Sequence, residues 1–197
     1  MPASKRRIEP NDILPARDYA AHRKDYRAAR MANKPKRTLH VGPYATILFE
    51  SYDSMWLQVQ EMLYIEKGGD EQLADELAAY NPMIPDGTEL TATMMLEIED
   101  AGQRARVLAT LGRIEDHVAI RIGPDRIAAR PVGEEERTNA SGKTSAVHFF
   151  RFPFSPSQIA AFREPGTPIL FEIDHPNYGH IAIVGDAMRA ELLKDFA

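Results

Sequence analysis

The chain has 197 residues, a length that favours a single domain. Its 44% apolar and 27% charged residues are ordinary globular values, which exclude wholesale disorder and low-complexity architectures. Because the chain contains no cysteine, it cannot form a disulfide scaffold, a thiolate nucleophile, a Cys-based zinc site or a Cys-ligated iron–sulfur cluster. Neither a run of about 18 apolar residues nor an apolar signal core is present, so we expect a soluble, cytoplasmic protein without a membrane span.

Charge is distributed unevenly along the chain. Residues 1–37 hold eleven Lys and Arg against four acids, a net charge of +7, whereas the other 160 residues carry −12. A basic segment of this kind can contact phosphates, an acidic partner or the acidic remainder of its own chain. Since no RNA-binding motif and no zinc finger accompanies it, we expect a solvated or self-docking helix and not a nucleic-acid partner.

The first half of the chain predicts three helices and one interrupted strand. The helices cover residues 15–31, 54–67 and 70–80, and Gly68-Gly69 separates the last two. Residues 38–49 are β-rich but contain Gly42-Pro43, so they predict an edge strand or a strand bent at that point. The first helix has only a thin apolar stripe, made of the following side chains: Tyr19, Tyr26 and the stems of Arg23 and Arg30.

The middle of the chain contains the clearest strand, residues 89–99, in which apolar and polar side chains alternate. A helix over 103–114 follows, and strands 117–122 and 126–130 form a hairpin. Residues 131–144 are polar and acidic, and we interpret them as a mobile loop.

The last part of the chain predicts a strand at 146–152, a short helix at 157–163, a hairpin of strands 169–174 and 180–184, and a final helix at 186–196. Short connections between neighbouring strands favour antiparallel pairing.

These elements predict an α+β fold with a mainly antiparallel sheet of about six strands flanked by helices. Residues 1–37 would form an N-terminal basic helical arm, and 38–197 a single domain. Because thin-striped helices often complete their burial against a second copy, a homodimer is also expected.

Most catalytic motifs are missing. Ser141-Gly142-Lys143-Thr144 matches the end of a phosphate-binding loop, but Arg137 stands where that loop requires its first glycine. No zincin, serine-hydrolase or dinucleotide-binding signature occurs. The sequence therefore offers only constellations of side chains as candidate sites.

The C-terminal hairpin provides the first constellation. If residues 175–179 form its turn, Asp174 lies opposite His180, and a carboxylate beside an imidazole suits a general base or a metal ligand. His175 would add a second nitrogen and Tyr178 a hydroxyl, so Asp174 and His180 are catalytic candidates, and Asp174, His175 and His180 metal candidates. The alternative is a cross-strand polar pair that only stabilises the hairpin.

His148 and Arg151 form the second constellation. Alternation places His148 on the same strand face as Phe150 and Phe152, and Arg151 on the other face. An arginine at the end of a strand can bind a carboxylate or phosphate with two hydrogen bonds. A histidine among phenylalanines is more often a core residue. His117, at the start of a strand, receives no role.

Several blocks spread over nearly the whole chain resemble an uncharacterised bacterial family, domain of unknown function 3501. The blocks are Arg7-Ile8-Glu9-Pro10, Phe49-Glu50 leading into Gln58-Val59-Gln60-Glu61-Met62-Leu63, Ile84-Pro85-Asp86-Gly87-Thr88-Glu89-Leu90-Thr91-Ala92-Thr93-Met94-Met95, and His148-Phe149-Phe150-Arg151-Phe152. The resemblance implies a redox or peroxide-stress setting and a redox protein as partner. Relatives commonly carry an Asn-Arg pair after the Phe-Glu, where this chain has Ser51-Tyr52.

Two functions remain open at this point. The first is a non-enzymatic accessory protein that binds a partner through its basic or acidic surface. The second is a metal- or small-ligand-binding enzyme that uses the His/Asp cluster of the C-terminal hairpin, with His148 or Arg151 converging on it.

Overall fold

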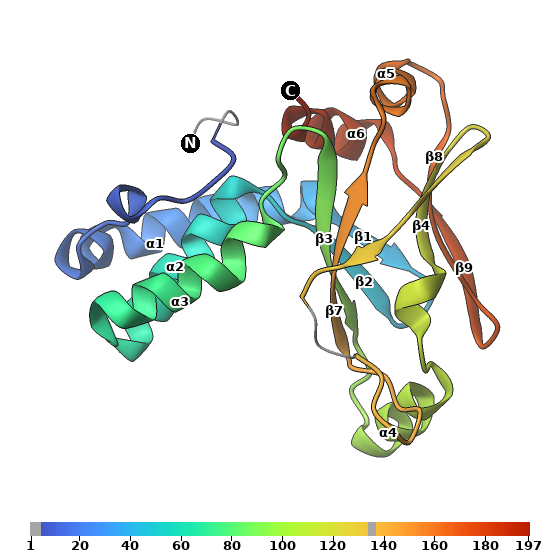
Figure 1. Ribbon diagram of the computed structural model, residues 1–197, viewed down its shortest axis with the longest axis horizontal. Helices are drawn as coiled ribbons and strands as arrows, with labels where there is room; N and C mark the ends of the chain where they lie inside the picture. The colour runs from blue at the N-terminus through green and yellow to red at the C-terminus, as the bar shows by residue number, and fades with distance from the viewer. Residues whose placement is uncertain (1–4, 134–136) are drawn as a thin grey trace.

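The computed structural model describes residues 5–133 and 137–197, and within these ranges it contains six α-helices and two antiparallel sheets. They form three layers, with α1–α3 on one side, a five-stranded sheet in the middle and a four-stranded sheet on the other side (Figure 1). The helices are α1 (Ala16–Asn33), α2 (Tyr52–Glu66), α3 (Gly69–Tyr80), α4 (Ala101–Thr110), α5 (Pro156–Arg163) and α6 (Asp186–Leu192).

The five-stranded sheet has the order β1-β2-β3-β7-β6 and the four-stranded sheet the order β5-β4-β8-β9. The first sheet is built from β1 (Thr38–Val41), β2 (Ala45–Phe49), β3 (Glu89–Leu96), β7 (Val147–Pro153) and β6 (Arg130–Pro131). The second is built from β5 (Asp125–Ala128), β4 (Val118–Ile122), β8 (Ile169–His175) and β9 (Tyr178–Ile183). The α+β class with antiparallel strands is confirmed, although the strands divide between two sheets.

The main core lies between the two sheets. Alternation along β7 points Phe150 and Phe152 inward, and both are fully buried. Phe171 of β8 meets Phe152 and Phe49 edge-on, with ring centroids 5.7 and 6.1 Å apart. Aromatic pairs at these separations add to the stabilisation from apolar burial, so these contacts hold the sheets face to face.

The second face of β3 is covered, not solvated. Glu89 and Thr91 are buried there, beneath the helical layer and its connections. The Thr91 hydroxyl donates to the Met83 carbonyl at 2.6 Å, and the Thr93 hydroxyl donates to Glu50 at 2.7 Å. Buried polar groups must be satisfied in this way. The polar side of this strand therefore anchors the helices to the sheet.

The helices have a small core of their own, and α1 contributes to it. Tyr19 is buried, its ring lies 6.3 Å from that of Trp56, and its hydroxyl donates to Glu61. Arg23 donates to the two oxygens of Glu61 at 2.8 and 2.7 Å. The structure thus does not confirm a separate basic arm, because α1 packs on α2. The domain boundary at residue 37 stays a prediction.

Two segments, residues 38–49 and 131–144, differ from the single strand and the loop that the sequence predicts. Residues 38–49 form a hairpin of β1 and β2, in which Gly42 has a φ of +67° that favours glycine. In the segment 131–144, Pro131 belongs to β6 and Thr138 bridges Thr144, while the acidic centre 134–136 lies outside the described residues. Within the described part of the chain, no helix is long and apolar enough to span a membrane.

Candidate functional site

The predicted pairing of Asp174 with His180 is wrong by one residue. In the structure Asp174 lies opposite Gly179, and His180 lies opposite Ile173. Because successive side chains alternate between faces, this shift places the carboxylate and the imidazole on opposite sides of the sheet. The turn contains only Pro176 and Asn177, since Tyr178 is part of the strand.

Tyr178 explains why the strand begins early. Its hydroxyl accepts hydrogen bonds from the backbone amides of Tyr44 and Ala45, both at 2.9 Å, and donates to the carbonyl of Val41 at 2.7 Å. The same side chain packs edge-on against His180, with ring centroids 4.5 Å apart. These bonds tie β9 to the β1–β2 turn, so the tyrosine predicted as a ligand-binding residue supports the fold.

Asp174 pairs with His117, which no sequence pattern singles out. His117 Nδ1 lies 2.9 Å from the Asp174 carboxylate, and Arg126 donates to the same carboxylate at 3.1 Å. Glu172 accepts from Arg126 and from Arg121 beside them. The cluster lies on the outer face of the four-stranded sheet, where Asp174 and His117 are partly exposed. The contact between His117 and Asp174 follows from the pairing of β4 with β8, which the sequence does not show.

His175 is buried, and both of its ring nitrogens have backbone partners. Its Nε2 lies 3.2 Å from the Gly112 carbonyl, and its Nδ1 accepts from the Asn177 amide at 3.2 Å. Its ring meets that of His117 edge-on at 5.0 Å. Across residues 5–133 and 137–197, no three His, Asp or Glu side chains gather in a way that could hold a metal ion.

His148 is buried in the core beside Phe150, as its strand face predicts. Its Nε2 faces the Ser145 carbonyl at 3.0 Å, whereas its Nδ1 lies 3.8 Å from a Glu115 oxygen. Both Nδ1 and that Glu115 oxygen are buried without a hydrogen-bond partner. Burial lowers the pKa of His148, so its neutral form is favoured.

Arg151 makes a bidentate pair with Glu89. Its Nε lies 2.8 Å from each carboxylate oxygen, and Nη2 donates to one of them as well. Hydrogen bonding to Glu89 raises the pKa of Arg151. The guanidinium thus has a carboxylate, as predicted for an arginine in this position, but the carboxylate belongs to the neighbouring strand. The structure does not bring Arg151, His148 and the hairpin into one site.

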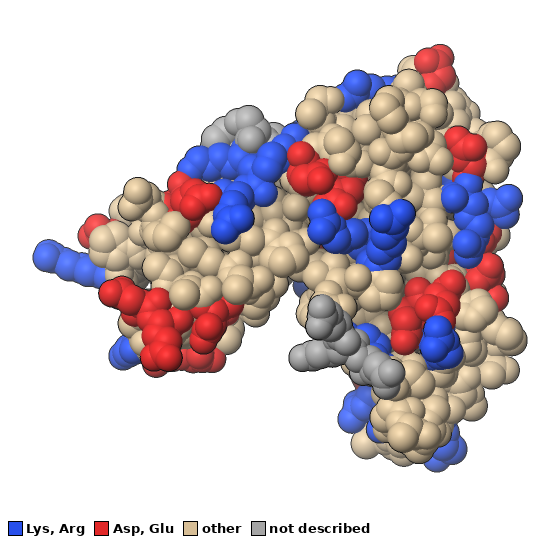
Figure 2. Space-filling model, in the orientation of Figure 1, with Lys and Arg blue, Asp and Glu red and all other residues tan. Residues whose placement is uncertain are grey.

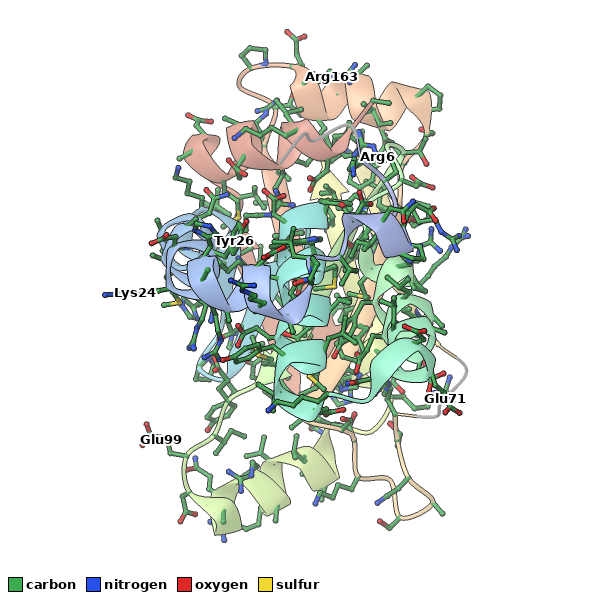
Figure 3. All side chains as sticks on the ribbon, turned by 90° about the vertical axis from the view of Figure 1, so that its left-hand side faces the viewer. Arg6, Lys24, Tyr26, Glu71, Glu99 and Arg163 are labelled. Carbon is green, nitrogen blue, oxygen red and sulfur yellow. The ribbon has the colours of Figure 1, made fainter. Side chains whose placement is uncertain are left out.

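A cleft between α1, α2 and the C-terminal segment is the better candidate. It consists of two cavities of about 280 and 150 Å³. Four residues line both cavities: Asn33, Arg37, Ser51 and Asp53. Figure 3 turns the helical layer toward the viewer and labels Tyr26, which lines the larger cavity, and Arg6, which lines the smaller one. We call this pair of cavities the helical cleft.

Local sequence signals build the walls of the helical cleft. Ser51 caps α2 and forms a capping box with Ser54. Behind it, Glu50 is buried and accepts hydrogen bonds from the Ser54 and Thr93 hydroxyls, both at 2.7 Å. Through Glu50, the start of α2, which lines the helical cleft, is therefore held to the sheet by hydrogen bonds.

Arg37 closes the cleft toward the C-terminus. It donates to the carbonyls of Phe49 at 3.0 Å and Glu50 at 2.7 Å, and it also bonds the carboxylate of Asp195. Burial raises the pKa of Asp195, while the charge of Arg37 opposes that shift. Arg37 is only 2% exposed, so these bonds satisfy a buried cation and leave it little capacity for a ligand.

Arg30 is different. It lines the larger cavity, and its nearest acid is Glu50 at 3.8 Å, beyond hydrogen-bond distance. Within the described residues its guanidinium donates no hydrogen bond, and burial lowers the pKa of Arg30. Arg189, a buried arginine elsewhere, uses three nitrogens on backbone carbonyls. Arg30 thus keeps its planar donor set available in a cavity.

The sequence carried a weak signal for this site. Helical spacing places Tyr26 and Arg30 on one stripe of α1, to which the arginine stem contributes apolar surface. The partners that complete the cavity, Ser51, Asp53 and Trp56, come from the start of α2. Helical spacing in α1 and α2 can indicate that Tyr26 and Trp56 lie on the packed faces of the two helices. It cannot indicate that a cavity lies between these helices.

The comparisons with known proteins agree with the fold and assign no activity. The family model described as "Protein of unknown function (DUF3501)" matches residues 7–196. No curated protein matches the chain. The crystal structure of a novel protein of unknown function from Burkholderia pseudomallei K96243 is 34% identical, covers 96% of this chain and 99% of its own, and has a TM-score of 0.88.

Proposed function

The chain belongs to the DUF3501 family, and we propose that it is a non-enzymatic accessory protein that binds a small organic acid in the helical cleft. The proposal rests on one observation: Arg30 lines the larger cavity, and within the described residues its guanidinium donates no hydrogen bond. An arginine whose donors face a cavity is suited to bind a carboxylate with two parallel hydrogen bonds. Small-ligand sites combine such a polar anchor with apolar walls, and Trp56 and Leu57 provide these here.

The surroundings of Arg30 favour a ligand over an internal ion pair. At 3.8 Å, Glu50 compensates the charge of Arg30 in part, but its two oxygens already accept from Ser54 and Thr93. A ligand carboxylate that reaches the guanidinium would form charge-assisted hydrogen bonds where the protein supplies none.

Isothermal titration calorimetry with a panel of small carboxylic acids tests the proposal. We expect millimolar or tighter binding of an acid with a short apolar tail, such as 4-methylpentanoate. Arg30→Gln should weaken it at least about tenfold, because the lost charged hydrogen bonds contribute about 1.5–3 kcal/mol. Arg27→Gln is the matched control, since Arg27 is exposed on the same helix. Equal affinity of wild type and Arg30→Gln, or no binding of any acid, would overturn the proposal.

The enzyme alternative keeps one supporting observation, the contact of His117 with Asp174. A carboxylate that orients an imidazole suits general-base chemistry. Arg126 shares that carboxylate, and this network of charges on an open sheet face favours a stabilising role. If the wild type shows any catalytic activity, its loss in His117→Gln at unchanged stability would support the enzyme alternative.

Three expectations complete the proposal and rest on the sequence alone. They are a redox protein as partner, a homodimer and a cytoplasmic location. Light scattering of the purified chain tests the dimer, and a pull-down from the native host tests the partner.

A further inference from the structure

The helical cleft also contains a charge of opposite sign to Arg30, the carboxylate of Asp53. Asp53 lines both cavities, and within the described residues its carboxylate accepts no hydrogen bond and forms no ion pair. Its charge and that of Arg30 interact, yet no ion pair of the described chain joins them. The larger cavity is thus lined by a cation and an anion that form no ion pair with each other.

Local chemistry keeps Asp53 available. It lies in the first turn of α2, where a negative charge is stabilised by the helix dipole. Asp53 is exposed, but the surrounding protein partly desolvates its carboxylate and raises the pKa of Asp53, while several positive charges, Arg37 and Arg30 among them, oppose the shift. A ligand cation would compensate this desolvated charge.

One part of the wall of the larger cavity is apolar and aromatic. Tyr26 and Trp56 meet edge-on with ring centroids 5.0 Å apart, and Ala29 and Leu57 lie beside them. The indole nitrogen of Trp56 donates to the Asp12 carbonyl at 2.8 Å, so the indole offers a ring surface and no polar group. Such a wall suits an apolar or aromatic side chain.

The size of the cavity limits the ligand further. About 280 Å³ lies just below the usual range for small-molecule sites, about 300–1,000 Å³, which suits one small metabolite and not a nucleotide or a peptide. The adjoining cavity of about 150 Å³ is lined by Lys5, Arg6 and Lys194 among others, and it is the more polar extension.

Resting on the proposed function, we infer that the ligand is a free α-amino acid with an apolar side chain. Arg30 binds its carboxylate, Asp53 binds its ammonium group, and Tyr26 and Trp56 receive its side chain. Binding an acid alone would leave Asp53 without a partner and bring a second negative charge close to it. A zwitterion satisfies both groups at once.

Calorimetry with three related ligands tests this inference: L-leucine, 4-methylpentanoate, which lacks the ammonium group, and isopentylamine, which lacks the carboxylate. We expect L-leucine to bind at least about tenfold more tightly than either analogue. Asp53→Asn should abolish the preference of L-leucine over 4-methylpentanoate, and it should strengthen 4-methylpentanoate binding because a repulsive charge is removed. Asp18→Asn, which changes an exposed acid in the first turn of α1, is the matched control.

The outcomes separate this inference from the proposed function. If 4-methylpentanoate binds as tightly as L-leucine, or if Asp53→Asn keeps the preference for L-leucine, the amino-acid inference is wrong while acid binding through Arg30 stands. If Arg30→Gln leaves the affinity for 4-methylpentanoate and L-leucine unchanged, both are wrong. Repeating the titrations with L-phenylalanine and 3-phenylpropionate shows whether the aromatic wall selects the side chain.

Discussion

Replacing Tyr178 by phenylalanine tests how the two sheets are joined. The substitution removes one hydroxyl that serves two amides, of Tyr44 and Ala45, and one carbonyl, of Val41. Val41 and Ala45 are 0% and 1% exposed, so water does not reach these groups in the native fold. A buried polar group without a partner costs about 1–3 kcal/mol, and two such groups predict a loss of about 3 kcal/mol.

Urea denaturation and thermal unfolding measure this loss. For a chain of this length, about 3 kcal/mol corresponds to a fall in Tm of about 6–12 °C. Tyr44→Phe is the matched control, because the Tyr44 hydroxyl accepts a single bond from Gln103 at 3.1 Å and the residue is half-buried. If Tyr178→Phe destabilises the protein no more than Tyr44→Phe does, the hydroxyl does not join β9 to the β1–β2 turn.

Two further predictions concern buried polar atoms and backbone geometry. Glu115→Gln gives His148 Nδ1 a donor and should raise the free energy of unfolding at pH 7 by about 1 kcal/mol. Because burial lowers the folded-state pKa of His148 from an unfolded value near 6.5, stability should be full above about pH 6.5 and decline below it, more steeply in Glu115→Gln. Urea midpoints from about pH 5 to 8 measure both effects, and a lower midpoint of the variant at pH 7 contradicts the argument. Gly42→Ala would place a Cβ 2.5 Å from the His180 ring and should cost about 3 kcal/mol, whereas Gly123→Ala, which also has a positive φ but meets nothing within 4 Å, should cost about 1 kcal/mol. Equal losses of unfolding free energy in the two variants would show that the close approach of His180 is not what requires glycine.

Elements with a strong local pattern could be predicted from the sequence. The alternation of side chains predicts β7 and its inward phenylalanines, and the pair Gly68-Gly69 predicts the break between α2 and α3. These signals depend on residues that are neighbours in the chain, so one sequence contains them in full. The division into two sheets could not be predicted, because it depends on which strands pair across long connections.

The hairpin shows how a small local error changes the functional interpretation. A five-residue turn and a two-residue turn both fit the sequence around Pro176 and Asn177, and they differ in which residue lies opposite Asp174. What decides between them is Tyr178, whose partners lie more than 130 positions away in the chain. The correct imidazole for Asp174 was therefore out of reach of any local argument.

The uneven distribution of charge along the chain also bears on the helical cleft. The positive charge of residues 1–37 does not form a free arm, because Arg23 bonds Glu61 and Arg37 bonds Asp195, both from the acid-rich remainder. Such pairing explains why a segment of net charge +7 packs on a body of −12. Arg30 belongs to the same segment and is held by the same packing, but its acid stands 3.8 Å away. Arg23 and Arg37 thus have acids of this chain at hydrogen-bond distance, whereas Arg30 lines a cavity and has its acid farther away. This contrast is the basis on which we propose a ligand for Arg30.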